Sequence, residues 1–436
     1  MQKKIYHSLL PLLFFALISG CVLTGCKEDD PTIPYILTQE DIQIVTPENG
    51  FAATIGQPFK IEVETVSDEG VTYQWYLNGA VISQTKNLEY TFKSAGEYDF
   101  RLIAKQGELT YEYTCHITVS NGKQEEQGPS AYITKVLDFM PAVGQFTNTM
   151  PEYEEGDTQE SMNAKVLKAI GNGNRGMISL GGFGGYVVVG FDHTIENVPG
   201  KRDFRVLGNA FDAAENPSPN APEGGSCEPG VIMVAYDVNK NGIPDDDEWY
   251  EIAGSSHHNP AQELWYQKAV DNGNDVDILY DYEITYYRPQ NEPATEEERD
   301  TYIRWEDNRG NSGYKVKNIY HDQCYYPLWA GDELTLKGTR LPQNGIDEGV
   351  EGNYYFVLYK FLYGYADNAT NNSDESAIDI DWAVDKDGNK ANLPGVDFIR
   401  IHTGVNQENG WLGECSTEIS GVEDLHILGI DINTRQ

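Results

Sequence analysis

Hydrophobic and polar residues alternate with a period of two in short runs through the first third of the chain. The runs are FKIEVETV (59–66), VTYQWYLNG (71–79), YDFRLIAKQ (98–106) and LTYEYTCHITV (109–119), with turn residues between them. Alternation of this kind predicts strands that bury one face, and short strands at regular spacing predict a β-sandwich. We therefore expect a sandwich domain over residues 41–120.

Two aromatic positions in this domain carry a resemblance. Trp75, in Tyr-Gln-Trp-Tyr, and the later Gly96-Glu97-Tyr98 resemble PKD and immunoglobulin-like modules. The resemblance implies that Trp75 lies in the core and Tyr98 near a corner of the sandwich. Cys115 has no partner on an earlier strand, so the antibody-type disulfide is not expected. We interpret the module as a spacer, with ligand binding as the alternative.

Beyond a charged, aperiodic linker at 121–130, the pattern changes but stays rich in strands. Residues 131–436 are long enough for a substantial core. MNAKVLKAI (162–170) repeats its apolar residues with helical spacing and predicts a short helix, whereas MISLGGFGGYVVVGFD (177–192) predicts two strands joined by a glycine-rich bend. The expected fold is mostly β: the N-terminal sandwich, then one large β-sandwich domain of jelly-roll type.

A weak sequence similarity between two segments, called here the internal echo, leaves open an alternative architecture for this large domain. FDHTIENVPGKRDFRVLGNAF (191–211) aligns by eye with VDKDGNKANLPGVDFIRIHTGV (384–405). Both contain an aspartate, then Asn-Val/Leu-Pro-Gly and an Asp-Phe that opens an alternating run. An internal duplication of the domain is therefore the alternative to a single undivided sandwich.

The first residues predict export. Lys3 and Lys4 precede an apolar run, 9–18, that is too short for a membrane span. Leu-Thr-Gly-Cys26 resembles a bacterial lipobox, with Cys21 as the alternative lipidation site, and the acidic 27–30 resembles the tag that sends Bacteroidota lipoproteins to the cell surface. We expect a signal peptide at 1–26, a stalk at 27–40 and a lipid anchor on the outer membrane, facing outward.

The net charge and the cysteine content of the chain argue against several classes of partner and site. The formal net charge is −38, so nucleic acid and anionic lipid headgroups are poor partners. Cysteines beyond the signal region are scattered without a CxxC spacing, so neither a zinc site nor a dense disulfide framework is indicated. The sequence leaves a disulfide bridge between Cys227 and Cys415 as an alternative.

The segment DVNKNGIPDDDEWY, which starts at residue 237, has the spacing of a calcium loop. Oxygen-bearing side chains fall at loop positions 1, 3, 5, 9 and 12, with a glycine at position 6. Predicted strands flank it, so we expect a hairpin loop rather than an EF-hand. The full oxygen shell favours a structural Ca²⁺ over a catalytic one; an acidic turn without metal is the alternative. The expected ligands are Asp237, Asn239, Asn241, Ile243 (through its carbonyl), Asp245 and Glu248.

Aromatic residues mixed with polar ones mark the stretch from Trp265 to Trp329 as a candidate ligand site. The segments 303–314 and 321–329 are expected to be loops, where binding residues tend to lie. Tyrosine and tryptophan offer flat apolar faces with a polar tip, although core packing would account for about half of them. The predicted ligand-binding residues are Trp305, Asn308, Tyr314, Tyr325, Tyr326 and Trp329.

Hydrolytic motifs are absent from the sequence. The chain has no G-x-S-x-G and no H-E-x-x-H, and we interpret His257 and His258 as surface residues. A pair of carboxylates for glycoside cleavage stays open because an acidic chain offers many candidates. We therefore expect a protein that is not an enzyme, with a glycosidase or esterase as a minor alternative.

The C-terminal region as a whole resembles a known group. VLDFMPAVGQFTNTMPEYEEGDT (136–158), EPGVIMVAYDVNKNGIPDDDEWYEIAGS (228–255) and GVDFIRIHTGVNQENGWLGECSTEISG (395–421) are similar to cell surface proteins of gut Bacteroidota, which include BtuH-type vitamin B12-binding lipoproteins. The resemblance implies capture of cobalamin or a related corrinoid and its delivery to a TonB-dependent outer-membrane transporter. The alternative is a calcium-dependent glycan-binding surface protein, since such modules also combine calcium loops with exposed aromatics.

Overall fold

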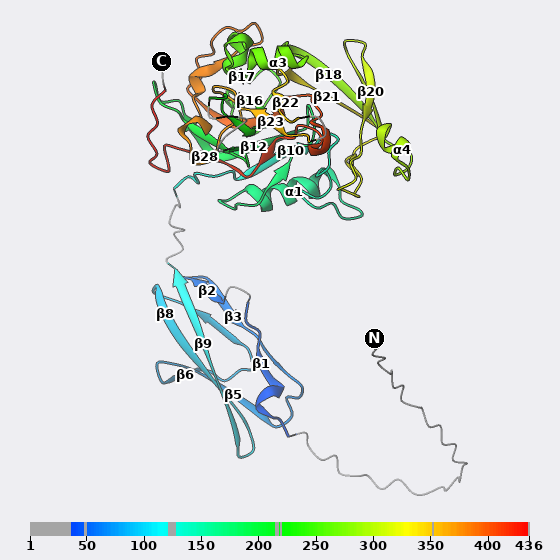
Figure 1. The fold of residues 1–436 in the computed structure, drawn as a ribbon. Coiled ribbons are helices and arrows are strands. Elements are labelled where there is room, and N and C mark those ends of the chain that lie inside the picture. The colour runs from blue at the N-terminus through cyan, green and yellow to red at the C-terminus, as the bar shows by residue number, and fades with distance from the viewer. Residues whose placement is uncertain are drawn as a thin grey trace, which may run out of the picture. The chain divides into compact units, whose positions relative to one another are not determined.

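The computed structural model divides the chain into two compact units, Met1–Glu126 and Gln127–Gln436 (Figure 1). It describes residues 36–47, 50–120, 128–213, 218, 220–350 and 353–434. The predicted signal peptide, both candidate lipidation cysteines, most of the stalk and most of the 121–130 linker lie outside these residues. No helix within the described part of the chain is long and apolar enough to cross a bilayer.

The N-terminal unit is built from the alternating runs of its sequence. A five-stranded sheet has the order β2-β9-β8-β5-β6, and β1 pairs with β4 and β3 with β7. Trp75 is fully buried in its core and donates its indole N–H to the Lys86 carbonyl at 3.1 Å. The predicted β-sandwich with a tryptophan in its core is confirmed. Its strands are β1 (Ile42–Ile44), β2 (Phe51–Thr54), β3 (Pro58–Ile61), β4 (Val63–Thr65), β5 (Val71–Leu77), β6 (Ala80–Ser83), β7 (Leu88–Thr91), β8 (Gly96–Gln106) and β9 (Leu109–Ser120).

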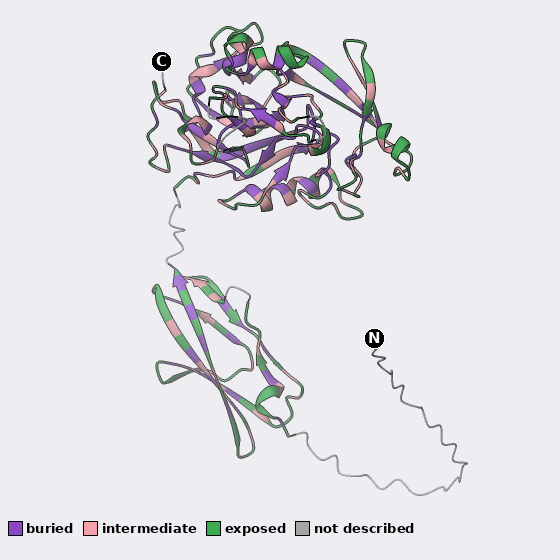
Figure 2. Ribbon diagram, in the orientation of Figure 1, coloured by how far each residue is buried: buried purple, intermediate pink, exposed green. Residues whose placement is uncertain are grey.

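The C-terminal unit is organised around a six-stranded antiparallel sheet with the order β10-β12-β26-β16-β17-β25. One face of the sheet is apolar, because alternate residues such as Val189, Ile232 and Ile399 enter the main core. Helix α1 packs on β10 with Met162, Val166 and Ile170 buried, which confirms the predicted helix (Figures 1 and 2). The elements concerned are β10 (Lys135–Met140), α1 (Gln159–Ile170), β12 (Tyr186–Glu196), β16 (Gly230–Ala235), β17 (Trp249–Ile252), β25 (Ala383–Val384) and β26 (Gly395–Thr403).

Smaller sheets surround this centre. A four-stranded sheet, β20-β19-β18-β21, carries a second core rich in tyrosine, and another, β14-β15-β23-β22, carries a third. The strands of these two sheets and of the other small sheets in this unit are β11 (Ile178–Ser179), β13 (Phe204–Leu207), β14 (Phe211–Asp212), β15 (Gly224–Ser226), β18 (Leu279–Tyr287), β19 (Ile303–Asp307), β20 (Ser312–Lys315), β21 (Glu333–Arg340), β22 (Gly345–Asp347), β23 (Phe356–Tyr359), β24 (Ala377–Ile378), β27 (Glu418–Ile419) and β28 (Gly421–Asp424). Short helices connect them: α2 (Ser255–His258), α3 (Tyr266–Asn272), α4 (Glu296–Asp300), and the 3₁₀ turns η1 (Gln39–Asp41), η2 (Pro260–Gln262), η3 (Asp374–Ser376), η4 (Ile380–Trp382) and η5 (Gly410–Leu412).

The structure refines several sequence predictions for this unit. The fold is mostly β, as expected, and the glycine-rich bend joins β11 to β12. The segment 303–314 was expected to be a loop, but it is the β19–β20 hairpin, whose polar turn around Asp307 and Gly310 hid its strands. The two segments of the internal echo supply β13 and β26, which lie in different sheets. Among the described residues, Cys115, Cys227, Cys324 and Cys415 are free thiols.

Candidate functional site

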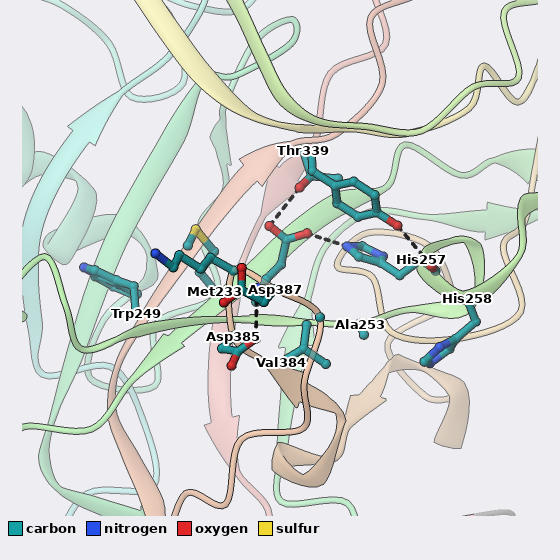
Figure 3. Close-up of a pocket in the computed structure, with 13 residues that line it drawn as sticks. Met233, Trp249, Ala253, His257, His258, Thr339, Val384, Asp385 and Asp387 are labelled. Atoms are coloured by element: carbon teal, nitrogen blue, oxygen red, sulfur yellow. Dashed lines mark hydrogen bonds and ion pairs between the residues drawn. The ribbon is translucent and has the colours of Figure 1, made fainter.

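A cavity of about 520 Å³ lies on the face of the six-stranded sheet opposite the main core (Figure 3). Strands β16, β17 and β25 supply its floor, β21 and α2 supply one wall, and the turn after β25 supplies the other. Its volume falls within the range of about 300–1,000 Å³ that is usual for small-molecule sites. The lining residues are Met233, Trp249, Glu251, Ala253, His257, His258, Tyr280, Thr339, Val384, Asp385, Lys386, Asp387 and Gly388.

Strand register places the floor residues side by side. Met233 is paired with Glu251, and Glu251 with Val384, so the three side chains form one row on the same face. On the other side of Met233 the row continues to Arg400. The Arg400 guanidinium lies 4.5 Å from the Tyr186 ring centroid, and its Nη1 donates to the Met233 sulfur at 3.5 Å. This row therefore carries the charged side chains of Glu251 and Arg400 beside the apolar Met233 and Val384, whereas the opposite face of the same strands is aliphatic.

Glu251 is held at the centre of the cavity by two donors. The His257 Nε2 and the Thr339 hydroxyl, at 2.9 Å, contact its two carboxylate oxygens. The other His257 nitrogen, Nδ1, lies 3.1 Å from the Tyr365 hydroxyl, so both ring nitrogens are engaged. Burial works to raise the pKa of Glu251, but the hydrogen bonds from His257 and Thr339, together with the nearby histidine charge, outweigh it and the pKa lies below its ordinary value. An ionised, fixed carboxylate thus faces the cavity at neutral pH.

Aromatic side chains form two sides of the cavity. Trp249 is half-buried, and Tyr280 is 57% exposed with its hydroxyl donating to the His257 carbonyl at 3.0 Å. The Trp249 indole lines the cavity. Such rings can cover the apolar face of a ligand while their polar tips stay hydrated.

The turn after β25 adds acidic and basic groups at the rim. Asp385 accepts the backbone N–H groups of Asp387 and Asn389, both at 2.9 Å, which fixes the turn. Lys386 and Asp387 are exposed. The rim therefore offers both hydrogen-bond donors and acceptors to a polar ligand.

The aromatic residues predicted as ligand contacts do not gather at this cavity, and none of the six lines it. Tyr325 and Tyr326 are 2% and 0% exposed and belong to the tyrosine-rich core. Trp329 is stacked between Tyr153 and Phe139, with its indole N–H donating to Gln159. Tyr325 and Tyr326 are therefore core residues, and Trp329 is a partly buried ring packed against the main core.

The other three predicted contacts lie on the β19–β20 hairpin. Trp305 packs against the tyrosine-rich core opposite Gly313, where a Cβ atom would lie 2.9 Å from the indole ring. Asn308 is exposed, and its amide donates to the Asp281 carbonyl at 2.7 Å. Tyr314 is 48% exposed. Trp305 therefore packs against the same core as Tyr325 and Tyr326, whereas Asn308 and Tyr314 are exposed on the hairpin.

The predicted calcium loop joins β16 to β17, as a hairpin loop should. Asp237 accepts the N–H groups of Asn241 at 3.0 Å and Gly242 at 2.8 Å. Glu248, 6% exposed, accepts those of Val238 and Asp245. Asn239 and Asn241 both direct their amide groups to Asp245, whereas the Ile243 side chain is exposed. These hydrogen bonds hold the loop together, and Ca²⁺ binding stays a prediction.

A second oxygen-rich group lies inside the unit. Glu228, Asp367 and Glu418 have carboxylate oxygens within 4.8 Å of one another, an arrangement unique among the described acidic, histidine and cysteine side chains. Backbone and hydroxyl donors satisfy them: Ser416 donates to Glu228 and to Glu418, and the Glu418 N–H donates to Asp367. Burial, and then repulsion between the carboxylates, raises the pKa of Glu228 and Glu418, and burial raises that of Asp367. Protons, or a hard cation such as Ca²⁺, could neutralise this buried charge.

Sequence reasoning missed most of the cavity. His257 was interpreted as a surface residue, but its side chain is only 5% exposed and orients Glu251. Glu251, Thr339 and Val384 come from distant strands, and no spacing in the sequence joins them. The usable signal was the alternation in β17, where Trp249 and Glu251 fall on the face opposite Ile252.

Comparison with known proteins identifies the N-terminal module. Residues 41–106 match the model of the PKD-like domain, so the chain contains such a domain, as its Trp75 and Tyr98 suggested. No curated protein matches the chain.

Solved structures offer only distant likenesses. A SusE-like protein has 9% identity over 88% of this chain and 97% of its own, with a TM-score of 0.19. A carbohydrate-binding module of the β-sandwich superfamily has 10% identity over 89% and 98%, with a TM-score of 0.17. A Bacteroides ovatus surface glycan-binding protein from a mixed-linkage glucan utilisation locus, SGBP-B, solved with a heptasaccharide, has 11% identity over 40% of this chain and 37% of its own, with a TM-score of 0.16. At these TM-scores the likenesses carry no argument about this chain's ligand.

Proposed function

We propose that this protein is a non-enzymatic glycan-binding protein of the cell surface, and that the cavity over β16, β17 and β25 is its glycan site. The anchor would be the lipid on Cys26, with the PKD-like domain as a spacer between the membrane and the binding unit. Delivery of the ligand to a TonB-dependent transporter stays part of the proposal. The observation that carries the proposal is the combination of two aromatic side chains, Trp249 and Tyr280, with a fixed carboxylate, Glu251, in one cavity.

Sugar rings need this combination. Their C–H faces pack on aromatic rings, and their hydroxyl groups need closely spaced donors and acceptors. Trp249 and Tyr280 supply the rings, while Glu251 and the rim carboxylates of Asp385 and Asp387 supply acceptors. Lys386 supplies a donor. A ligand without apolar faces would leave the indole unused, and a purely apolar one would leave the exposed rim groups of Lys386 and Asp387 unused.

The hydrogen bonds of the cavity carboxylates and the lowered pKa of Glu251 favour ligand binding over catalysis of a reaction. Both oxygens of Glu251 are occupied by His257 and Thr339, and its lowered pKa opposes a role as general acid. Asp385 is engaged by the backbone of its own turn. Fixed, ionised groups of this kind orient a ligand; a glycosidase would need one carboxyl group kept protonated.

The corrinoid hypothesis came from the resemblance of the C-terminal region, and its predicted ligand contacts lay in the aromatic stretch from Trp305 to Trp329. Two of those tyrosines are in the core, and a corrinoid with its nucleotide arm is far larger than a cavity of about 520 Å³. Cobalamin capture therefore has less structural support than glycan binding. It remains testable in the same experiment.

The test is binding by the purified protein to oligosaccharide ladders of glucan, xylan, mannan and galactan, from disaccharides to octasaccharides, with cyanocobalamin as the competing ligand. Calorimetry on Trp249→Ala should show a loss of about tenfold or more for the bound sugar, since one ring contact is worth roughly 1.4 kcal/mol. Trp411→Ala is the matched control, because Trp411 is 53% exposed and does not line the cavity. Retention of cyanocobalamin, with no heat from any oligosaccharide, would replace the glycan proposal with the corrinoid one.

A further inference from the structure

A second aromatic cavity, of about 420 Å³, lies close to the first. Its walls include Trp382 and Tyr363, whose ring centroids are 5.0 Å apart with planes inclined by 50°. Leu362, 40% exposed, and the carboxylates of Asp374 and Glu375 also line it. This cavity thus repeats the chemistry of the first one, with two aromatic rings beside acidic acceptors.

A buried arginine stiffens the second cavity. Arg202 is 7% exposed, and its Nη1 donates to the carbonyls of Asp374 at 2.6 Å and Ala377 at 2.9 Å. Its guanidinium lies 5.2 Å from the Trp382 ring centroid. The indole is therefore held in place from one side by a cation–π contact, which fixes its orientation before any ligand arrives.

The two cavities share a wall. Trp382 lines the second cavity and Val384, two residues later, lines the first, so their Cα atoms are at most about 7 Å apart. The carbonyl of Trp382 accepts the N–H of Ala253, which also lines the first cavity, at 2.9 Å. The carbonyl of Tyr363 likewise accepts the N–H of Ser255 at 3.0 Å. The partition consists of β25 and the chain after β17, and β25 is the edge strand of its sheet.

We propose that the second cavity is a further subsite of the glycan site, so that the protein recognises an oligosaccharide chain that crosses the edge strand β25 rather than a single terminal sugar. This inference rests on the proposed function. One sugar packs against Trp249 and Tyr280, and units further along the same chain reach Trp382 and Tyr363. Two linked subsites add their binding free energies because the second contact is made within one complex.

The test uses the same oligosaccharide ladders and separates the two cavities by chain length. For the wild-type protein, affinity should rise by about tenfold or more between disaccharide and octasaccharide. Trp382→Ala should bind the disaccharide as the wild type does and lose the gain from the longer chains. Leu362→Arg, a change at an exposed position in the second cavity, should act in the same direction and guards against a folding defect in the tryptophan variant. Equal melting temperatures establish that the compared proteins are folded.

Each result has a distinct meaning. Length-dependent affinity that both variants keep would overturn the second subsite and leave the glycan proposal intact, as would affinity that does not rise with length. Loss of disaccharide binding in Trp249→Ala but not in Trp382→Ala supports the proposal, because the disaccharide then occupies the first cavity. No binding at any length would count against the glycan proposal itself, and the subsite would fall with it.

Discussion

Tyr326 and Tyr280 belong to the same aromatic-rich stretch of the chain, but one is a core residue and the other lines a cavity. Tyr326 is fully buried, its hydroxyl donates to the Gly331 carbonyl at 2.7 Å, and Arg288 covers its ring. Tyr280 is 57% exposed and forms part of the cavity wall. The first ring stabilises the fold and the second is free to meet a ligand. Residue type and local spacing are alike in the two places, so solvent access decides the role.

Carboxylates show the same contrast between the interior and the cavity. Glu418 is 4% exposed beside Glu228 and Asp367, and its pKa is raised. Glu251, at the cavity floor, has its pKa lowered by the hydrogen bond from His257 despite burial. A buried carboxylate without a cationic partner prefers its proton, whereas one held by histidine and threonine donors keeps its charge.

The largest effect should come from exchanging the two tyrosines for alanine. Tyr326→Ala removes a fully buried ring and should lower the free energy of unfolding by about 3–5 kcal/mol, as large aromatic deletions in cores do. Tyr280→Ala should change it by less than about 1 kcal/mol and instead weaken oligosaccharide binding. Urea denaturation of the two variants measures the difference. Similar unfolding free energies for both would erase the distinction between interior and cavity.

Metal removal compares the two oxygen-rich groups, one in an open hairpin loop and one in the interior. If Ca²⁺ occupies the loop at Asp237, EDTA should lower the melting temperature, because a ligand at a hundredfold excess over its Kd stabilises by about 2.7 kcal/mol. Differential scanning fluorimetry with and without EDTA measures this shift. Asp237→Asn should abolish the EDTA effect, whereas Glu418→Gln should preserve it. The reverse pattern would place the ion at Glu228, Asp367 and Glu418, and no EDTA effect in the wild type would remove the calcium prediction.

The smallest effect should be a pH dependence of stability. The folded-state pKa values of Glu228, Asp367 and Glu418 lie above their ordinary values, and that of Glu414 is raised to about 8, chiefly by burial. Between about pH 4 and pH 8 the folded state therefore binds more protons than the unfolded state, so stability falls as pH rises. Glu418→Gln should flatten the curve, measured by urea denaturation across this range. Glu251→Gln should not flatten it, because the folded pKa of Glu251 is lowered; equal slopes in all three proteins would contradict the raised pKa values.

The sequence by itself determined the strands, and with them the class of fold. The period-two runs located the N-terminal sandwich and its buried Trp75, and the apolar spacing of Met162, Val166 and Ile170 located α1. The DVNKNG segment was correctly placed as a hairpin loop between two strands. These features depend on neighbours within a few residues, where side-chain periodicity is a direct record of which face is buried.

Only the tertiary structure determined which side chains come together at the surface to form the cavity. Glu251, Thr339 and Val384 lie on three different strands, and their meeting depends on the pairing of β17 with β25 and on the approach of β21. Burial of Tyr325 and Tyr326 likewise depends on what covers them, which local pattern does not contain. Long-range pairing sets both, because each strand presents its faces to neighbours that are distant in the chain.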